Sequence, residues 1–144
     1  MPSINDIRRK LSQVNVTDAA VQAIELSEPE ILREQRHQLL EGKKANGTPI
    51  GKYRSLKYAA KKAAQNPLAG FGNVDLNLTG AFQSAVFLSV TSTTFIFESP
   101  DEKTAMLIGK YGDPFGLSPE SRAIVINERL RKEFIFIIKQ QIRK

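Results

Sequence analysis

VFLSV at Val86 to Val90 and FIFES at Phe95 to Ser99 are two short runs rich in β-branched and aromatic residues, and TSTT at Thr91 to Thr94 separates them. Such residues favour strands, and a short polar linker between two strands is typical of a hairpin. We therefore expect an antiparallel hairpin here. Alternation of side chains along the first strand would put three apolar residues on one face, namely Val86, Leu88 and Val90.

Helical patterns lie on both sides of this hairpin. Helix-start residues and apolar spacing predict four helices before it, from Ile4 to Gln13, from Thr17-Asp18 onward, from Ser27-Glu28-Pro29 to Gly42, and from Lys57 to Ala64 after a Ser55 cap. Two more are predicted after it, one starting at Ser99-Pro100 and ending at Gly109 or Gly112, and a long one starting at Ser118-Pro119. The order of elements predicts an α+β fold with N-terminal helices, a small antiparallel β-sheet and a long C-terminal helix.

The 144 residues suit a single domain. Within it we distinguish a helical N-terminal part (1–42), a basic loop and short helix (43–73), a sheet and short helix (74–117) and a C-terminal helix (118–144). In the third part, Val74, Leu76 and Leu78 alternate with polar residues and predict a strand. Thr79 and Gly80 would then form a structural turn that lets the chain pack back on itself.

The end of the chain is unusually apolar. An amphipathic stripe runs through the last predicted helix (Ala123, Ile126, Leu130, Phe134 and Ile137), and a fully apolar run overlaps it (Phe134, Ile135, Phe136, Ile137 and Ile138). An amphipathic surface helix does not need such a run, which is either buried on every side or in contact with another chain. Composition alone also allows a strand at this position.

Composition excludes several classes of protein. There is no cysteine, which excludes disulfide scaffolds, thiolate metal centres and cysteine nucleophiles and suits a protein made in a reducing cytoplasm. No apolar run approaches the ~20 residues of a membrane helix, and the first residues lack a signal-peptide core. We therefore expect a soluble protein that does not enter a membrane.

Positive charge is concentrated in one segment. The net charge is +6, and seven cations without any anion fall between Lys43 and Lys62: Lys43, Lys44, Lys52, Arg54, Lys57, Lys61 and Lys62. Tyr53 and Tyr58 are interleaved with them, an arrangement that suits phosphate neutralisation with base stacking. Contact with an acidic protein surface and plain solvation of the lysines are the other interpretations.

No catalytic, cofactor or metal motif emerges. His37 has Glu34 and Glu41 at helical spacing, but a metal site would need a third ligand that no motif supplies, so we interpret the triplet as a solvated helix face. Phosphate-binding loops, nucleophile elbows and dinucleotide-binding fingerprints are absent from the sequence. We predict a protein that is not an enzyme.

The ordered series of motifs from Gly47 to the C-terminus resembles a known group of proteins. It consists of a basic Gly/Pro loop with Tyr, then Asp75-Leu76-Asn77-Leu78-Thr79-Gly80-Ala81-Phe82, then a hairpin, then Lys110-Tyr111-Gly112 and Phe115-Gly116-Leu117 before a helix. This series is similar to small neck and tail virion proteins of tailed phages, especially crAss-like phages, and more distantly to head–tail connector and tail-completion proteins.

The resemblance implies a structural role without catalysis. Such proteins form homo-oligomeric rings between the portal and the tail, or cap the tail, after synthesis in the host bacterial cytoplasm. The apolar run Phe134 to Ile138 and the cationic C-terminus would then form a buried and docking surface, and the loop from Lys43 to Lys52 would reach a neighbouring ring or the packaged DNA. The alternative is a nucleic-acid-binding module that uses Lys43 to Lys62.

Overall fold

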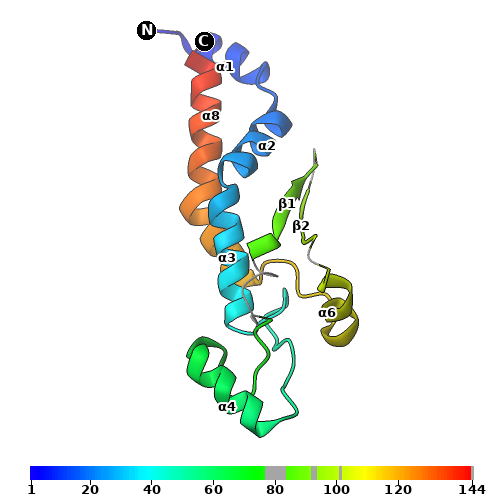
Figure 1. Ribbon diagram of the computed structural model, residues 1–144. Coiled ribbons are helices and arrows are strands. Elements are labelled where there is room, and N and C mark those ends of the chain that lie inside the picture. The colour runs from blue at the N-terminus through cyan, green and yellow to red at the C-terminus, as the bar shows by residue number, and fades with distance from the viewer. Residues whose placement is uncertain (77–83, 92–93, 101, 144) are drawn as a thin grey trace.

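A computed structural model describes residues 1–144 except 77–83, 92–93, 101 and 144. The chain is elongated, with the two termini at one end and α4 at the other (Figure 1). The elements before the hairpin are α1 (Ile4–Ser12), α2 (Val16–Leu26), α3 (Glu28–Leu40), α4 (Leu56–Gln65) and the short 3-10 helix η1 (Pro67–Ala69). The remainder are β1 (Phe87–Val90), β2 (Phe95–Glu98), α6 (Thr104–Tyr111), α7 (Pro119–Val125), η2 (Ile126–Leu130) and α8 (Arg131–Arg143).

The fold is α+β, as predicted. Strands β1 and β2 pair antiparallel, with Leu88 opposite Phe97 and Val90 opposite Phe95. Leu88 and Phe97 are buried on one face with Val86, whereas Phe87 and Ile96 remain largely exposed. The predicted face of the hairpin is therefore confirmed.

Local capping explains where several helices begin. Ser3 and Asp6 form the predicted capping box at α1, and Ser55 and Ser118 cap α4 and α7 through their side chains. Two starts differ from prediction. Asn15, and not Thr17 or Asp18, caps α2, and α6 begins at Thr104, several residues after Pro100.

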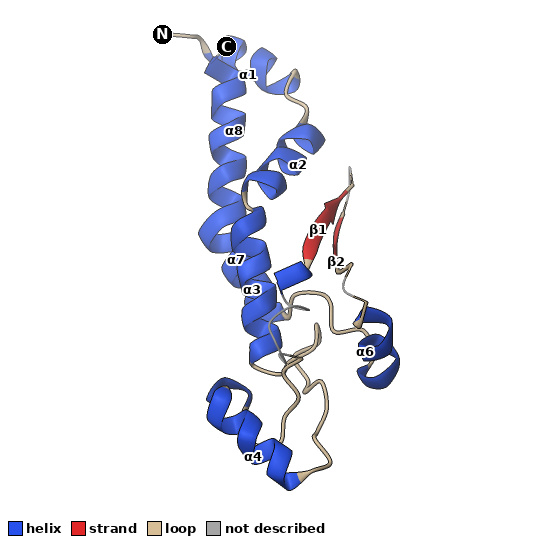
Figure 2. Ribbon diagram, viewed as in Figure 1, coloured by secondary structure: helices blue, strands red, loops and turns tan. Residues whose placement is uncertain are grey.

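Helix α3 is the central element (Figure 2). Ile31 belongs to a buried cluster with the hairpin and α7, and Leu39 belongs to a second cluster with Ile50 and Val74. A third cluster joins α2 to α8. Arg36 adds a polar link, because its Nη2 donates to the carbonyls of Ser84 and Val86 at 3.4 Å each, just before β1.

Two buried glutamines of α3 bind the backbone of the segment that leads into α7. Gln38 Nε2 donates to the Gly116 carbonyl at 2.7 Å, and Gln38 Oε1 accepts from the Ser118 amide at 2.7 Å. Gln35 Oε1 accepts from the Gly116 amide at 2.8 Å. These bonds satisfy backbone groups that would otherwise be buried without partners, so the two glutamines hold together segments about eighty residues apart in sequence.

The C-terminal helix is continuous but not uniform. Helices α7 and α8 are joined by η2, a π-helical turn. Within this turn, Arg129 Nε lies 3.7 Å from Glu30 Oε1 of α3, and Arg129 Nη2 lies 3.1 Å from Glu133 Oε1. A π-turn has i→i+5 hydrogen bonds and so shifts the phase of the helix after it. The predicted apolar stripe is therefore only partly correct, since Ala123 and Ile126 are exposed whereas Ile137 is buried.

The predicted strand from Val74 to Leu78 is wrong in its described part. Residues 74–76 form no regular strand, Leu76 has a positive φ of 54°, and Asp75 is buried beside its apolar neighbours. Alternation fails because Asp75 has a buried cationic partner, which the pattern could not reveal. Leu78, Thr79 and Gly80 lie outside the described residues, so the structural turn stays a prediction.

Replacing Gln38 by Met should lower the free energy of unfolding by about 3 kcal/mol, because it leaves the Gly116 carbonyl and the Ser118 amide buried without partners. Urea unfolding followed by circular dichroism measures this. Gln65→Met at the exposed end of α4 is the matched control and should change stability little. Equal effects of the two substitutions would contradict the importance of these hydrogen bonds.

Candidate interaction surfaces

The basic lobe, residues 43–73, is held by backbone bonds between its two loops. The Tyr53 amide donates to the Gly72 carbonyl at 2.9 Å, and the Val74 amide donates to the Gly51 carbonyl at 3.0 Å. Gly42, at the end of α3, has φ +75°, and a Cβ there would lie 2.9 Å from the Val74 carbonyl oxygen. The lobe is thereby fixed against the end of α3.

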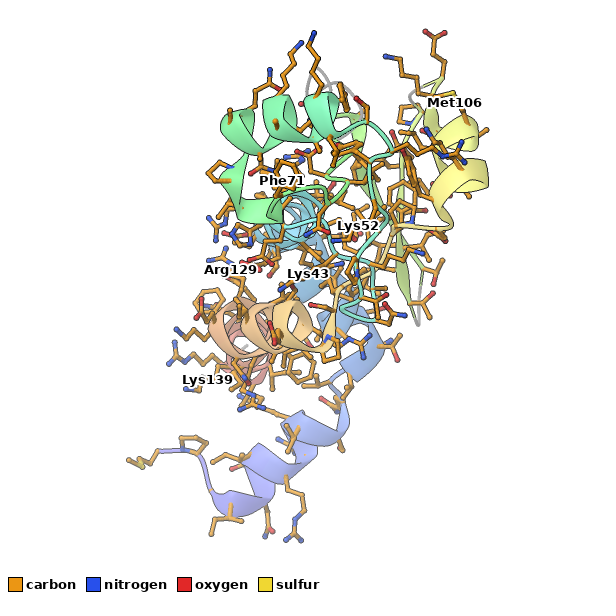
Figure 3. All side chains as sticks on the ribbon, turned by 90° about the horizontal axis from the view of Figure 1, so that it is seen from below. Lys43, Lys52, Phe71, Met106, Arg129 and Lys139 are labelled. Atoms are coloured by element: carbon orange, nitrogen blue, oxygen red, sulfur yellow. The ribbon has the colours of Figure 1, made fainter. Side chains whose placement is uncertain are left out.

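The structure divides the seven predicted surface cations into three groups. Lys52, Arg54, Lys57 and Lys61 are exposed, and Lys57 and Lys61 are one turn apart on α4. Lys43 and Lys44 are half-buried, and Lys43 Nζ lies 3.4 Å from Glu41 Oε2. Figure 3 shows the molecule from the α4 end, with Lys43 and Lys52 labelled.

Lys62 does not belong to the surface, which corrects our expectation. Only 5% of the residue is exposed, and its Nζ lies 2.9 Å from Asp75 Oδ1. Asn66 Nδ2 donates to Asp75 Oδ2 at 3.0 Å and to the Leu40 carbonyl at 2.7 Å. This buried polar network joins α4 to the 74–76 segment and to the end of α3.

Tyr53 completes the network at its edge. Its hydroxyl donates to Asp75 Oδ1 at 3.3 Å. Burial and, next, the nearby Asp75 carboxylate raise the pKa of the Tyr53 phenol well above its usual value. Tyr53 therefore remains a neutral hydrogen-bond donor, and its ring packs edge-on against Tyr58 with centroids 4.9 Å apart. Neither tyrosine is a free stacking platform.

The apolar run at the C-terminus has one buried and one exposed side. Ile137 packs against Ala19 and Ala23 of α2, with Phe134 and Ile138 half-buried beside them. Ile135 and Phe136 point away from this contact and are 44% and 56% exposed. The run is thus helical, and it is not buried on every side.

Helix α1 carries an apolar stripe that the sequence analysis treated only as a sign of helix. Ile4, Ile7 and Leu11 follow one another at spacings of three and four, so they share a helix face. Their exposed fractions are 78%, 41% and 50%, and α1 has no buried residue. Amphipathic spacing identified the stripe, but only the tertiary structure shows that it stays at least 41% exposed although α1 packs beside α8.

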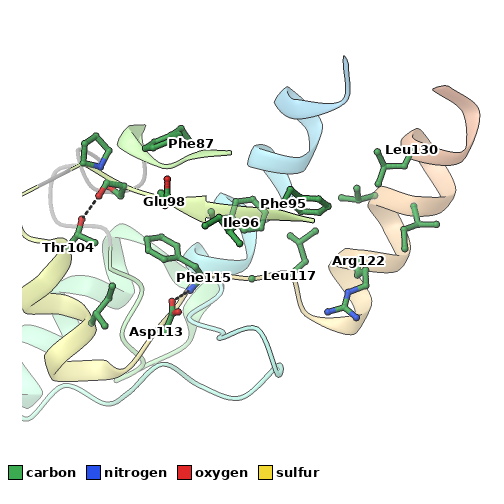
Figure 4. A pocket seen from close by; sticks show the side chains of 17 residues that line it. Phe87, Phe95, Ile96, Glu98, Thr104, Asp113, Phe115, Leu117, Arg122 and Leu130 are labelled. Atoms are coloured by element: carbon green, nitrogen blue, oxygen red, sulfur yellow. Dashed lines mark hydrogen bonds between the residues drawn. The ribbon is translucent and has the colours of Figure 1, made fainter. Parts of the chain in front are cut away.

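A groove of about 850 Å³ opens between β2 and the C-terminal helix (Figure 4). Its walls are largely apolar and include Phe95, Ile96, Phe115, Ile126 and Leu130. Its polar lining includes Glu98, Asp113 and Arg122. No sequence pattern predicted this groove, because its walls come from the hairpin, the 113–117 segment and the π-turn, which are distant in sequence.

The described residues contain no assembled metal centre. No group of three or more His, Cys, Asp or Glu lies close enough to hold a metal ion in this part of the chain. His37 lies on the exposed face of α3 with its Nδ1 3.8 Å from Glu41 Oε1. None of the helices searched there is long and apolar enough to cross a bilayer.

Comparison with protein-family models, curated proteins and solved structures finds no match to this chain. Its surfaces must therefore be interpreted from their own chemistry. They are the exposed apolar residues of the helical arm (α1, α2 and α8), the apolar groove and the basic lobe.

Replacing Lys62 by Met should lower the free energy of unfolding by about 3 kcal/mol, because it removes one partner of a buried ion pair and leaves the Asp75 carboxylate uncompensated. Lys61→Met, one residue away on the exposed face of α4, should have almost no effect. Chemical denaturation of both variants provides the measurement. Similar losses from the two would show that the pair is not buried in solution.

Tyr53 should make stability fall at alkaline pH. A raised folded-state pKa means that its contribution is complete below the unfolded value of about 10 and is lost as the pH rises above it. Tyr53→Phe cannot ionise, so its urea midpoint should decline less steeply above pH ~10 than that of the wild type. Parallel declines for the two proteins would contradict this assignment.

Proposed function

We propose that this chain is a structural virion protein of a tailed bacteriophage, placed in the neck or tail as a homo-oligomeric ring. The exposed apolar side chains of the helical arm carry the proposal. Large apolar residues gathered on an exposed surface are typical of sites that contact other proteins. An assembly subunit needs such surfaces, and it needs no catalytic centre.

The exposed side chains support a subunit with two different ends. The arm holds the exposed Ile135 and Phe136, whereas the basic lobe holds the exposed Arg54, Lys57 and Lys61 at the opposite end (Figure 1). A neck protein would use the first for contacts with proteins and the second near packaged DNA or an acidic neighbour. The motif series from Gly47 onward adds the resemblance to neck and tail proteins.

Within this role we assign Ile135 and Phe136 to docking on the portal or on an adjoining neck protein. Their neighbour Ile137 anchors α8 to α2, so the exposed pair stands on a supported helix and not on a free end. We propose the virion as the site of function, after synthesis in the host cytoplasm.

Mixing the purified chain with the portal assembly of the same phage tests the proposal. Light scattering should show a ring-sized mass or a complex with the portal. Ile135→Gln/Phe136→Gln should weaken portal binding more than about tenfold, because two apolar contacts are lost. Met106→Gln on α6, where the replaced side chain is 60% exposed, is the matched control and should bind normally. A concentration-independent monomer that ignores the portal would contradict the proposal.

Nucleic-acid binding is the second candidate, and the exposed cations of the basic lobe favour it. Arg54, Lys57 and Lys61 have no anionic residue between them in sequence. If this were the main function, DNA affinity would fall steeply with salt, and Arg54→Glu/Lys57→Glu/Lys61→Glu would abolish it. Weak DNA binding in the wild type, unchanged by this triple substitution, would exclude this candidate.

A further inference from the structure

The apolar stripe of α1 and the apolar groove fit one another, but they lie apart on the same chain. α1 packs beside α8 at the end that holds both termini (Figure 1), whereas residues of the hairpin, α6 and the C-terminal helix line the groove. We propose that α1 of one copy lies in the groove of the next copy. This inference rests on the proposed ring, and it names the contact between neighbouring subunits.

The shape of the two surfaces supports this contact. Ile4, Ile7 and Leu11 form a row of anchors at the spacing by which an amphipathic helix binds a groove. A helix of nine residues is marginal without tertiary packing, and the stripe stays 41% to 78% exposed although α1 packs beside α8, so a second apolar partner would stabilise it. The groove offers exposed Ile96 and Ile126 with half-buried Phe95 and Leu130.

Charge also matches. On a helical wheel, Arg8 and Lys10 flank the stripe on its two sides. On another face of the helix, Arg9 Nη2 lies 3.3 Å from Asp6 Oδ1, so these two charges pair with each other. The groove presents two carboxylates, Glu98 and Asp113, against one cation, Arg122. The basic edges of the stripe thus meet a groove lining of net negative charge, which favours α1 over an acidic or neutral segment.

The topology of such a contact leads to a chain of subunits or a ring. Stripe and groove are different surfaces, so the contact is heterologous, and each copy offers one of each. Contacts of this kind repeat until the rotation between neighbours closes a ring. The π-turn contributes Ile126 and Leu130 to the groove, so the irregular part of the C-terminal helix lies at the proposed contact.

Two full-length variants test the pairing. The stripe variant, Ile7→Gln/Leu11→Gln, keeps the charge and helix propensity of α1 but loses two anchors. The groove variant, Ile96→Lys/Ile126→Lys, places cations where a basic helix should bind. The replaced side chains are 38% to 52% exposed, so both variants should unfold at the wild-type urea midpoint. Leu26→Gln, at an equally exposed apolar residue of α2, is the control.

Sedimentation velocity up to millimolar concentration should show self-association of the wild type and of the control. Each variant alone should associate more than about tenfold more weakly. An equimolar mixture of the two should form a complex that stops at two chains, because one intact stripe and one intact groove remain. A mixture that stays monomeric, or a wild type that never associates, overturns the inference.

The portal-binding measurement separates this inference from the neck role. If the mixture of the stripe and groove variants stays monomeric but the wild-type chain still binds the portal, the neck role stands and the stripe–groove contact is wrong. If the groove variant self-associates normally but loses portal binding, the groove receives a segment of a different protein, which also overturns the inference.

Discussion

The arrangement of the elements around α3 depends on hydrogen bonds between two buried glutamines, Gln35 and Gln38, and the backbone at Gly116 and Ser118. This contact fixes where the C-terminal helix starts, and the helix then determines the positions of the groove wall and of the arm. Helix α3 also positions the hairpin, because its Arg36 donates to the carbonyls just before β1. The groove exists because α3 positions both of its walls independently.

Elements with strong local signals could be predicted from the sequence. The hairpin face, the capping box at Ser3 and the helix starts at Ser55 and Ser118 depend on neighbours within a few residues, so the pattern contains the cause. The groove and the exposure of the α1 stripe could not be predicted, because both depend on which distant segments meet. Gln35 shares a helix face with Ile31 and Leu39, but the sequence does not show which backbone groups Gln35 and Gln38 bind.

The Lys62–Asp75 pair shows why charge counting misjudged the basic segment. A lysine in a run of cations is usually solvated, and an aspartate between apolar residues usually marks the polar side of a strand. Here each residue explains the burial of the other. Lys62 is also rotated by about 100° from Lys61 around α4, so helical geometry, which the count ignores, separates the structural cation from the exposed ones.

The π-turn between α7 and α8 makes room for one extra residue in the C-terminal helix. Its i→i+5 bonds give less rotation per residue than the about 100° of an α-helix, so the residues from Ile126 to Leu130 cover about the same angle as one residue fewer in a regular helix. Removing one of them would restore a regular helix and keep Ile137 against the α2 alanines. The same deletion made within α8 would instead turn the following residues by about 100° and take Ile137 away from α2. The π-turn is thus a place where the chain can gain or lose a residue beside the groove without changing the direction in which Ile135 and Phe136 point.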